Sequence, residues 1–158
     1  MIRLMPMTES DFQSYYDRAI AEYAEDHVRG GRWAVEEADE QARQSYRELL
    51  PEGLATPNQY LYTLTATNPP IPVGMLWFAL QSQAGQQVAF IYDVAIDPAF
   101  RRKGYATHAF RALEDHVRAQ GVHQIRLHVF GHNHEARALY EKLGYVATNI
   151  MMAKVLDQ

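Results

Sequence analysis

The chain has 158 residues, of which 47% are hydrophobic and 22% charged, and no apolar run approaches the ~20 residues of a membrane span, so we expect one cytoplasmic domain over residues 1–158. It contains no cysteine, which excludes disulfides, thiolate metal sites and a cysteine nucleophile. Residues 1–90 carry 6 Lys and Arg against 12 Asp and Glu, and residues 91–158 carry 9 against 7, which argues against a nucleic-acid-binding protein and suits an anion site in the second half.

The first half of the chain predicts two helices followed by three strands. Apolar and aromatic residues at helical spacing indicate one helix after a Thr8 cap, ending at Gly30, and a second helix that ends before Pro51. The strands are predicted from runs of β-branched and aromatic residues separated by Pro and Gly turns. They lie over residues 58–67, 72–81 and 87–97.

The second half predicts a helix, a strand, a shorter helix and further strand material. The helix runs from Gly104 to Gly121, and alternating apolar residues indicate a strand over residues 123–130. Asn133 is a suitable cap for the shorter helix, which ends at Gly144. Residues 145–156 supply the last strand of the predicted order.

The junction before the helix at Gly104 has the chemistry of a phosphate site. Residues 101–103 are Arg, Arg and Lys, although positive charge at a helix N-terminus is unfavourable by a few tenths to ~1 kcal/mol per residue. Bound phosphate would reverse this, because the free backbone N–H groups and the cations would share one anion. Gly104 allows close backbone approach and Thr107 adds a hydroxyl. A basic surface loop without a ligand is the alternative.

Two motifs together resemble those of the GNAT superfamily of acyl-CoA-dependent N-acyltransferases. Residues 101–106, with the sequence RRKGYA, fit the family signature (Q/R)-x-x-G-x-(G/A), whereas neither GxGxxG nor GxxxxGK[ST] occurs in the chain. Residues 132–145, HNHEARALYEKLGY, resemble the second motif, an Asn followed by Ala-Leu-Tyr-x-x-x-Gly-Tyr. The resemblance implies an α+β fold with a central mixed, mostly antiparallel sheet flanked by helices. It also implies an acetyl-CoA-dependent N-acetyltransferase with acetyl-CoA as co-substrate and no metal.

The resemblance assigns cofactor roles to individual residues. The strand residues would pair with the pantetheine arm, the turn residues would donate N–H groups to the pyrophosphate, Asn133 would bind further along the cofactor, and Tyr140 would protonate the departing thiolate. A phenol with a pKa near ~10 is a suitable acid for a thiolate whose conjugate acid has a pKa near ~8.5. The implied cofactor-binding residues are Val94, Ala95, Ile96, Arg101, Arg102, Lys103, Gly104, Tyr105, Ala106, Thr107, Asn133 and Tyr140.

The general base is less clearly marked by the sequence. Phe90 and His128 stand where several members of the superfamily have a glutamate. His128 itself is one candidate, since an imidazole with a pKa near ~6.5 suits proton transfer at neutral pH. Asp93 is the other, because a carboxylate within an apolar strand is costly unless it is paired or used. A water molecule is a third possibility.

Other functional classes remain as alternatives. His128, His132 and His134 permit a zinc site, although they lack the helical spacing of known zinc motifs. The serines lie in no nucleophile-elbow context, which argues against a serine hydrolase. A non-catalytic acyl-CoA-binding module and a nucleotide-binding protein would use the same turn.

The acceptor is expected to be a primary amine. The acidic helices of the first half favour a cationic acceptor, such as a polyamine, an aminoglycoside-like amine or a protein amino terminus. Acidic helices that only confer solubility would have the same composition. The aromatic content of these helices would also suit a homodimer contact.

Overall fold

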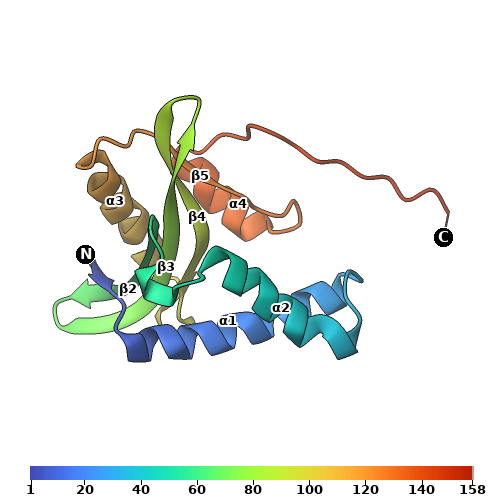
Figure 1. Cartoon of the computed structure of the whole chain (residues 1–158). Coiled ribbons are helices and arrows are strands. Elements are labelled where there is room, and N and C mark those ends of the chain that lie inside the picture. Colours follow the sequence, from blue (N-terminus) through green and yellow to red (C-terminus); the bar gives the residue numbers. More distant parts are fainter. Residues whose placement is uncertain (158) are drawn as a thin grey trace. The chain divides into compact units, whose positions relative to one another are not determined.

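A computed structural model describes residues 1–157 of the chain, which form an α+β fold with a five-stranded mixed sheet and four α-helices (Figure 1). The chain divides into two compact units, Met1–Leu127 and His128–Gln158. The first unit contains β1 Ile2–Pro6, α1 Glu9–Arg29, α2 Val35–Leu49, β2 Gln59–Thr67, β3 Pro70–Gln83, β4 Gln86–Ile96, α3 Tyr105–Arg118 and β5 Ile125–Leu127, with 3₁₀ turns at Gly53–Ala55 and Pro98–Phe100. The second unit contains α4 His134–Lys142.

The sheet has its strands in chain order, β1-β2-β3-β4-β5. Neighbouring strands are antiparallel except for β4 and β5, which are parallel, so the predicted mixed and mostly antiparallel sheet is confirmed. The parallel pair is short and joins Ala89–Ile91 of β4 to Ile125–Leu127 of β5. Within the described strands, the second edge of β4 is therefore unpaired beyond residue 91.

The predicted helices match the structure closely. Thr8 accepts from the Asp11 N–H and Asp11 reaches back to the Thr8 N–H, which forms a capping box at the start of α1. Side chains from α1, the end of α2, β2 and β3 form one apolar cluster against the sheet. Its buried members are Met7, Phe12, Tyr15, Ala19, Leu50, Leu61, Met75 and Trp77.

Three strand predictions were wrong or incomplete. β1 was not predicted, because Arg3 and Pro6 interrupt its short apolar run, and it forms by pairing with β2. The strand expected over residues 123–130 is limited to β5, so His128 lies beyond the strand. Residues 145–157 form no strand or helix, since β propensity without a neighbouring ladder does not produce a strand.

The backbones of β3 and β4 approach closely at Gly74. A Cβ at this position would lie 2.2 Å from the Ala95 carbonyl oxygen, so any side chain would push the strands apart. The Asp97 N–H donates to the Val73 carbonyl, 2.8 Å away, which continues the contact past the end of β4. Gly74 therefore fixes the end of β4 and the starting point of the turn that follows it.

A β-bulge changes the direction of the β4 side chains just before this point. Trp77 pairs with Asp93 and Phe78 pairs with Ile91, which leaves Tyr92 as the extra residue. The ring of Tyr92 stacks on Trp77 with centroids 4.8 Å apart, so Tyr92 and Asp93 both lie on the face covered by α1 and α2. Without the bulge, strand alternation would send one of them to the opposite face.

Candidate active site

Asp93 and Tyr15 form a hydrogen-bonded pair in which the pKa of each side chain is raised. The Tyr15 hydroxyl donates to the Asp93 carboxylate over 2.6 Å, joining α1 to β4. Burial raises the pKa of Asp93, and this increase is partly offset by hydrogen bonds from Tyr15 and the Val94 backbone N–H and by the charge of Arg18. Burial and the Asp93 carboxylate also raise the pKa of Tyr15, so its hydroxyl stays protonated and continues to donate.

This pair lies beside a cleft lined in part by four aromatic side chains, which we call the aromatic cleft. The cavity has a volume of about 370 Å³ and is formed by α1, α2, β3 and β4. Tyr46 of α2 is electrostatically coupled to the pair, since burial and the Asp93 charge both raise the pKa of Tyr46. The lining residues are Ala19, Glu22, Tyr23, Asp26, Ser45, Tyr46, Leu49, Trp77, Tyr92 and Asp93.

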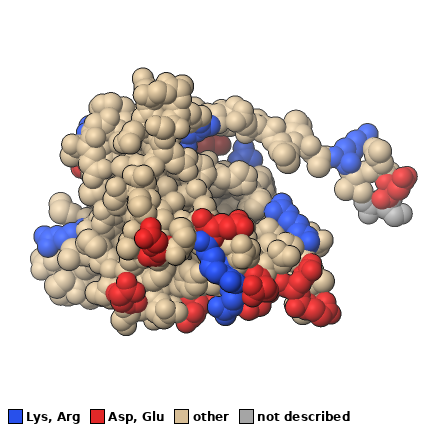
Figure 2. Space-filling view, in the orientation of Figure 1, with Lys and Arg blue, Asp and Glu red and all other residues tan. Residues whose placement is uncertain are grey.

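Acidic side chains are frequent around this part of the molecule. In Figure 2, Asp and Glu side chains cover much of the surface of α1 and α2, with Lys and Arg side chains between them. Several are paired within their helices, such as Glu25 with Arg29 at 2.8 Å and Asp39 with Arg43 at 2.8 Å. Of the carboxylates that line the cleft, Asp26 is also near Arg29, at 3.9 Å, whereas Glu22 and Asp93 make no ion pair among the described residues.

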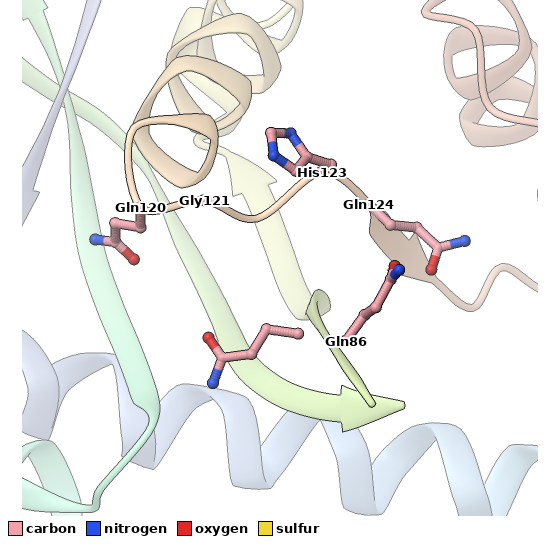
Figure 3. Close-up of a pocket in the computed structure, with 6 residues that line it drawn as sticks. Gln86, Gln120, Gly121, His123 and Gln124 are labelled. Carbon is pink, nitrogen blue, oxygen red and sulfur yellow. The ribbon is translucent and has the colours of Figure 1, made fainter. Parts of the chain in front are cut away.

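A larger hollow lies elsewhere in the same unit. It has a volume of about 670 Å³ and is formed by the turn between β3 and β4 and by the connection from α3 to β5 (Figure 3). Glutamines at positions 86, 87, 120 and 124 line it together with Gly121 and His123. It contains no carboxylate and none of the predicted site residues, so the smaller aromatic cleft is the better candidate for proton transfer.

The predicted cofactor turn has an anion-binding shape. Arg102 and Gly104 adopt left-handed φ angles of 63° and 81°, which bend the chain sharply into α3. Gly104 is the N-cap of α3 and provides no capping side chain, and the first turn of the helix has no acidic residue. The N–H groups of the first turn of α3 are therefore available to a phosphate oxygen.

Two of the three cations of this turn have contacts within the chain. The Arg101 Nε donates to the Ile96 carbonyl over 2.9 Å and so ties the turn to the end of β4. The Lys103 ammonium lies 5.9 Å from the centre of the Phe100 ring. Both side chains are exposed, and their contacts orient them around the turn.

The end of β4 has one open edge. Residues 93–96 pair with β3 on one side and, among the described strands, with none on the other. A free strand edge offers N–H and C=O groups to an extended ligand. Val94 and Ile96 are half-buried there and Ala95 is exposed, which leaves the backbone accessible. The edge and the turn contain the residues at which the family resemblance predicts cofactor binding.

The remaining predicted residues belong to the unit of residues 128–158. Asn133 caps α4 by accepting from the Ala136 N–H at 3.2 Å, as expected. Tyr140 lies on α4, half-buried, with its ring 5.8 Å from that of Tyr145. His128 is exposed and contacts the edge of Phe130. Within residues 1–157, the His, Asp and Glu side chains form no group of three that could hold a metal ion.

Sequence reasoning missed most of the aromatic cleft. It identified Asp93 as an isolated carboxylate in an apolar strand, but not Tyr15, which is 78 residues away in the chain. Tyr46 and Trp77, which line the cleft, were not singled out by any sequence pattern. The one available signal was the hydroxyl of Tyr15 on the buried face of α1, because a buried phenol requires a hydrogen-bond partner.

None of the helices in residues 1–157 combines the length and the apolar character needed to cross a membrane.

Comparisons with known proteins agree with the geometry. The model of the acetyltransferase (GNAT) family matches residues 16–145. The chain is 41% identical over 155 residues to the uncharacterized N-acetyltransferase YycN of Bacillus subtilis. The aligned region covers 98% of this chain and 99% of YycN. It is 35% identical over 153 residues to the uncharacterized N-acetyltransferase YdgE of the same organism, with 97% of both chains covered.

The fold agrees with a solved structure of the first of these relatives. The crystal structure of YycN from Bacillus subtilis matches with a TM-score of 0.89 and 40% identity over 100% of both chains. The matched family and this structural similarity agree with the family resemblance of the two sequence motifs. The chain belongs to the acetyltransferase (GNAT) family and is an acetyl-CoA-dependent N-acetyltransferase.

Proposed function

We propose that the protein transfers the acetyl group directly to a primary amine of a cationic acceptor bound in the aromatic cleft. The observation that carries this proposal is the partly buried Asp93 carboxylate, which lines the cleft and accepts a hydrogen bond from Tyr15. An amine arrives protonated at neutral pH, since its pKa is near ~10.4, and it must lose a proton before it can attack. A carboxylate at the cleft wall attracts the ammonium form and can then accept its proton.

In this proposal Asp93 takes the proton directly or through a water molecule. The amine nitrogen then attacks the thioester carbonyl and the C–N bond forms. As the C–S bond breaks, the nitrogen loses its second proton to solvent, which balances the proton that the thiolate gains. Burial supports this role, because a raised pKa makes Asp93 a stronger base than an ordinary carboxylate. His128 is the alternative base, but it is exposed and lies beyond β5.

Tyr140 is proposed to donate a proton to the departing CoA thiolate. This assignment rests on the position of Tyr140 in the Ala-Leu-Tyr motif of α4. The turn of residues 101–107 is proposed to hold the pyrophosphate through backbone N–H groups, with Asn133 binding further along the cofactor. The Val94 N–H interacts with the Asp93 carboxylate, so this N–H supports the base and is not assigned to the thioester carbonyl.

The test is release of CoA thiol from acetyl-CoA in the presence of a panel of amines. Tyr140→Phe should lower kcat by ~10- to 1000-fold and leave acetyl-CoA affinity nearly unchanged. Tyr60→Phe is the matched control, because Tyr60 stacks on Phe78 and belongs to neither proposed site. Equal kcat values for the two variants would remove the acid role of Tyr140. Thiol release that no amine accelerates would contradict the proposed transfer and favour an acyl-CoA-binding module.

A further inference from the structure

The aromatic cleft extends along one face of α1 from the Tyr15–Asp93 pair. Its α1 residues follow Tyr15 at helical intervals of 4, 7, 8 and 11 positions, which places them on successive turns of the same face. An α-helix rises 1.5 Å per residue, so Glu22 lies about 10 Å further along the axis than Tyr15. The cleft therefore has a carboxylate at each of two separated positions, Asp93 and Glu22.

Aromatic rings fill the wall between these positions. Tyr23 meets Tyr46 edge-to-face with centroids 5.6 Å apart, and Tyr46 lies 5.9 Å from Trp77. Trp77 in turn stacks on Tyr92, next to Asp93. This wall is apolar enough for methylene groups, and its ring faces attract ammonium groups. A long hydrophilic chain would gain little from such a surface.

Glu22 is available to a ligand in a way that its neighbours are not. Among the described residues Glu22 makes no ion pair, whereas Glu25 lies 2.8 Å from Arg29. Asp26, one turn beyond Glu22, is 3.9 Å from the same arginine, so its charge is partly compensated. Arg18, three residues after Tyr15 in α1, carries the positive charge that lowers the pKa of Asp93. The uncompensated carboxylate of the outer cleft is thus Glu22.

From this arrangement we infer that the acceptor is a linear aliphatic di- or polyamine. One terminal amine reaches Asp93 and becomes acetylated, while a second ammonium binds at Glu22, about two turns of α1 beyond the Tyr15 turn that holds Asp93. The methylene chain between them packs along the aromatic wall. This inference rests on the proposed function and adds the length and the second charge of the acceptor.

The inference is tested with amines that differ only in length and in the second charge. CoA thiol release is measured with diaminooctane, diaminobutane and octylamine, at saturating acetyl-CoA. Diaminooctane should have a kcat/KM at least about 5-fold above that of octylamine, because only the diamine places a charge at Glu22. Diaminobutane is too short to reach both carboxylates and should fall below diaminooctane.

Two matched variants locate the second charge. Glu22→Gln should reduce the ratio of the diaminooctane to the octylamine kcat/KM to about 1. Glu25→Gln, on the same helix but outside the cleft, should keep the wild-type ratio. Equal ratios in the two variants, or equal efficiency with the diamine and the monoamine in the wild type, would overturn the inference and leave the proposed function standing. Absence of release with every amine would overturn both.

Discussion

In the proposed function, the cofactor turn and the aromatic cleft recognise their ligands by different means. The turn, residues 101–107, offers backbone N–H groups whose directions are set by left-handed φ angles at Arg102 and Gly104. The cleft offers side chains from four elements that only the folded sheet brings together. We therefore expect the turn to be sensitive to backbone conformation and tolerant of changes in charge, and the cleft to be sensitive to the loss of single polar atoms.

The largest expected effect is the loss of kcat when the proposed base of the aromatic cleft is replaced. Asp93→Asn keeps the shape of the side chain but removes the base, so kcat should fall by ~10²- to 10⁴-fold while CoA affinity stays unchanged. Steady-state thiol release and a CoA titration measure the two quantities. Asp115→Asn is the control, because Asp115 is exposed and pairs with Arg118. A kcat within threefold of that control would transfer the base role to His128 or to water.

The same variant should also become more stable at neutral pH. The raised pKa of Asp93 means that the folded state binds a proton more tightly than the unfolded chain, so its contribution to stability is present at low pH and is lost as the pH rises through the folded pKa. A neutral amide at this position carries no such penalty. The Tm of Asp93→Asn should exceed that of the wild type at pH 7, and the difference should shrink as the pH falls through the raised folded pKa and change no further below the ordinary carboxyl pKa of ~3.9.

The comparison also explains how much the sequence could predict. The turn is a local feature, so consecutive residues 101–106 contained the whole signal, and the order of helices around it followed from periodicity and caps. Asp93 was recognisable as an anomaly, but Tyr15 is held against it by packing between α1 and the sheet, which no local pattern encodes. The expected strand over residues 145–156 failed for the same reason, because strand formation depends on a neighbour.

The next largest expected effect is a loss of cofactor affinity when the backbone of the turn is changed. Gly104→Val forces a β-branched residue into a left-handed φ of 81°, so the turn must rearrange and its N–H groups lose their alignment. CoA affinity, measured by calorimetric titration, should fall by about 100-fold, which is the loss expected when two or more charge-assisted hydrogen bonds are broken. Lys103→Ala should weaken binding only about threefold, since exposed charge contributes little.

A matched glycine separates the site from general strain. Gly121 also has a φ of 81°, and a Cβ at either position would meet no atom within 4 Å. Gly121→Val should therefore lower Tm about as much as Gly104→Val and leave CoA affinity near that of the wild type. If Lys103→Ala costs as much affinity as Gly104→Val, side-chain charge rather than backbone direction recognises the phosphates.

The smallest expected effect concerns Tyr15, the α1 residue that donates a hydrogen bond to the proposed general base, Asp93. Tyr15→Phe removes the hydroxyl that donates to Asp93, and this hydrogen bond lowers the pKa of that carboxyl. Without it the Asp93 pKa rises further, so the acidic limb of the kcat/KM profile should move to higher pH, and kcat at pH 7 should fall about 10-fold as the carboxylate loses its fixed orientation.

Tyr16→Phe provides the comparison for this positioning role. Tyr16 is the next residue of α1 and packs on Phe12 and Tyr46, so its replacement tests the loss of a phenol from the same helix. If Tyr15 served only to stabilise the fold, Tyr15→Phe would lower Tm, and the acidic limb would lie at the same pH in both variants. If the acidic limb of the kcat/KM profile moves in Tyr15→Phe and not in Tyr16→Phe, the Tyr15 hydroxyl determines the pKa of Asp93. The contact between α1 and β4 then controls the protonation state of the proposed base.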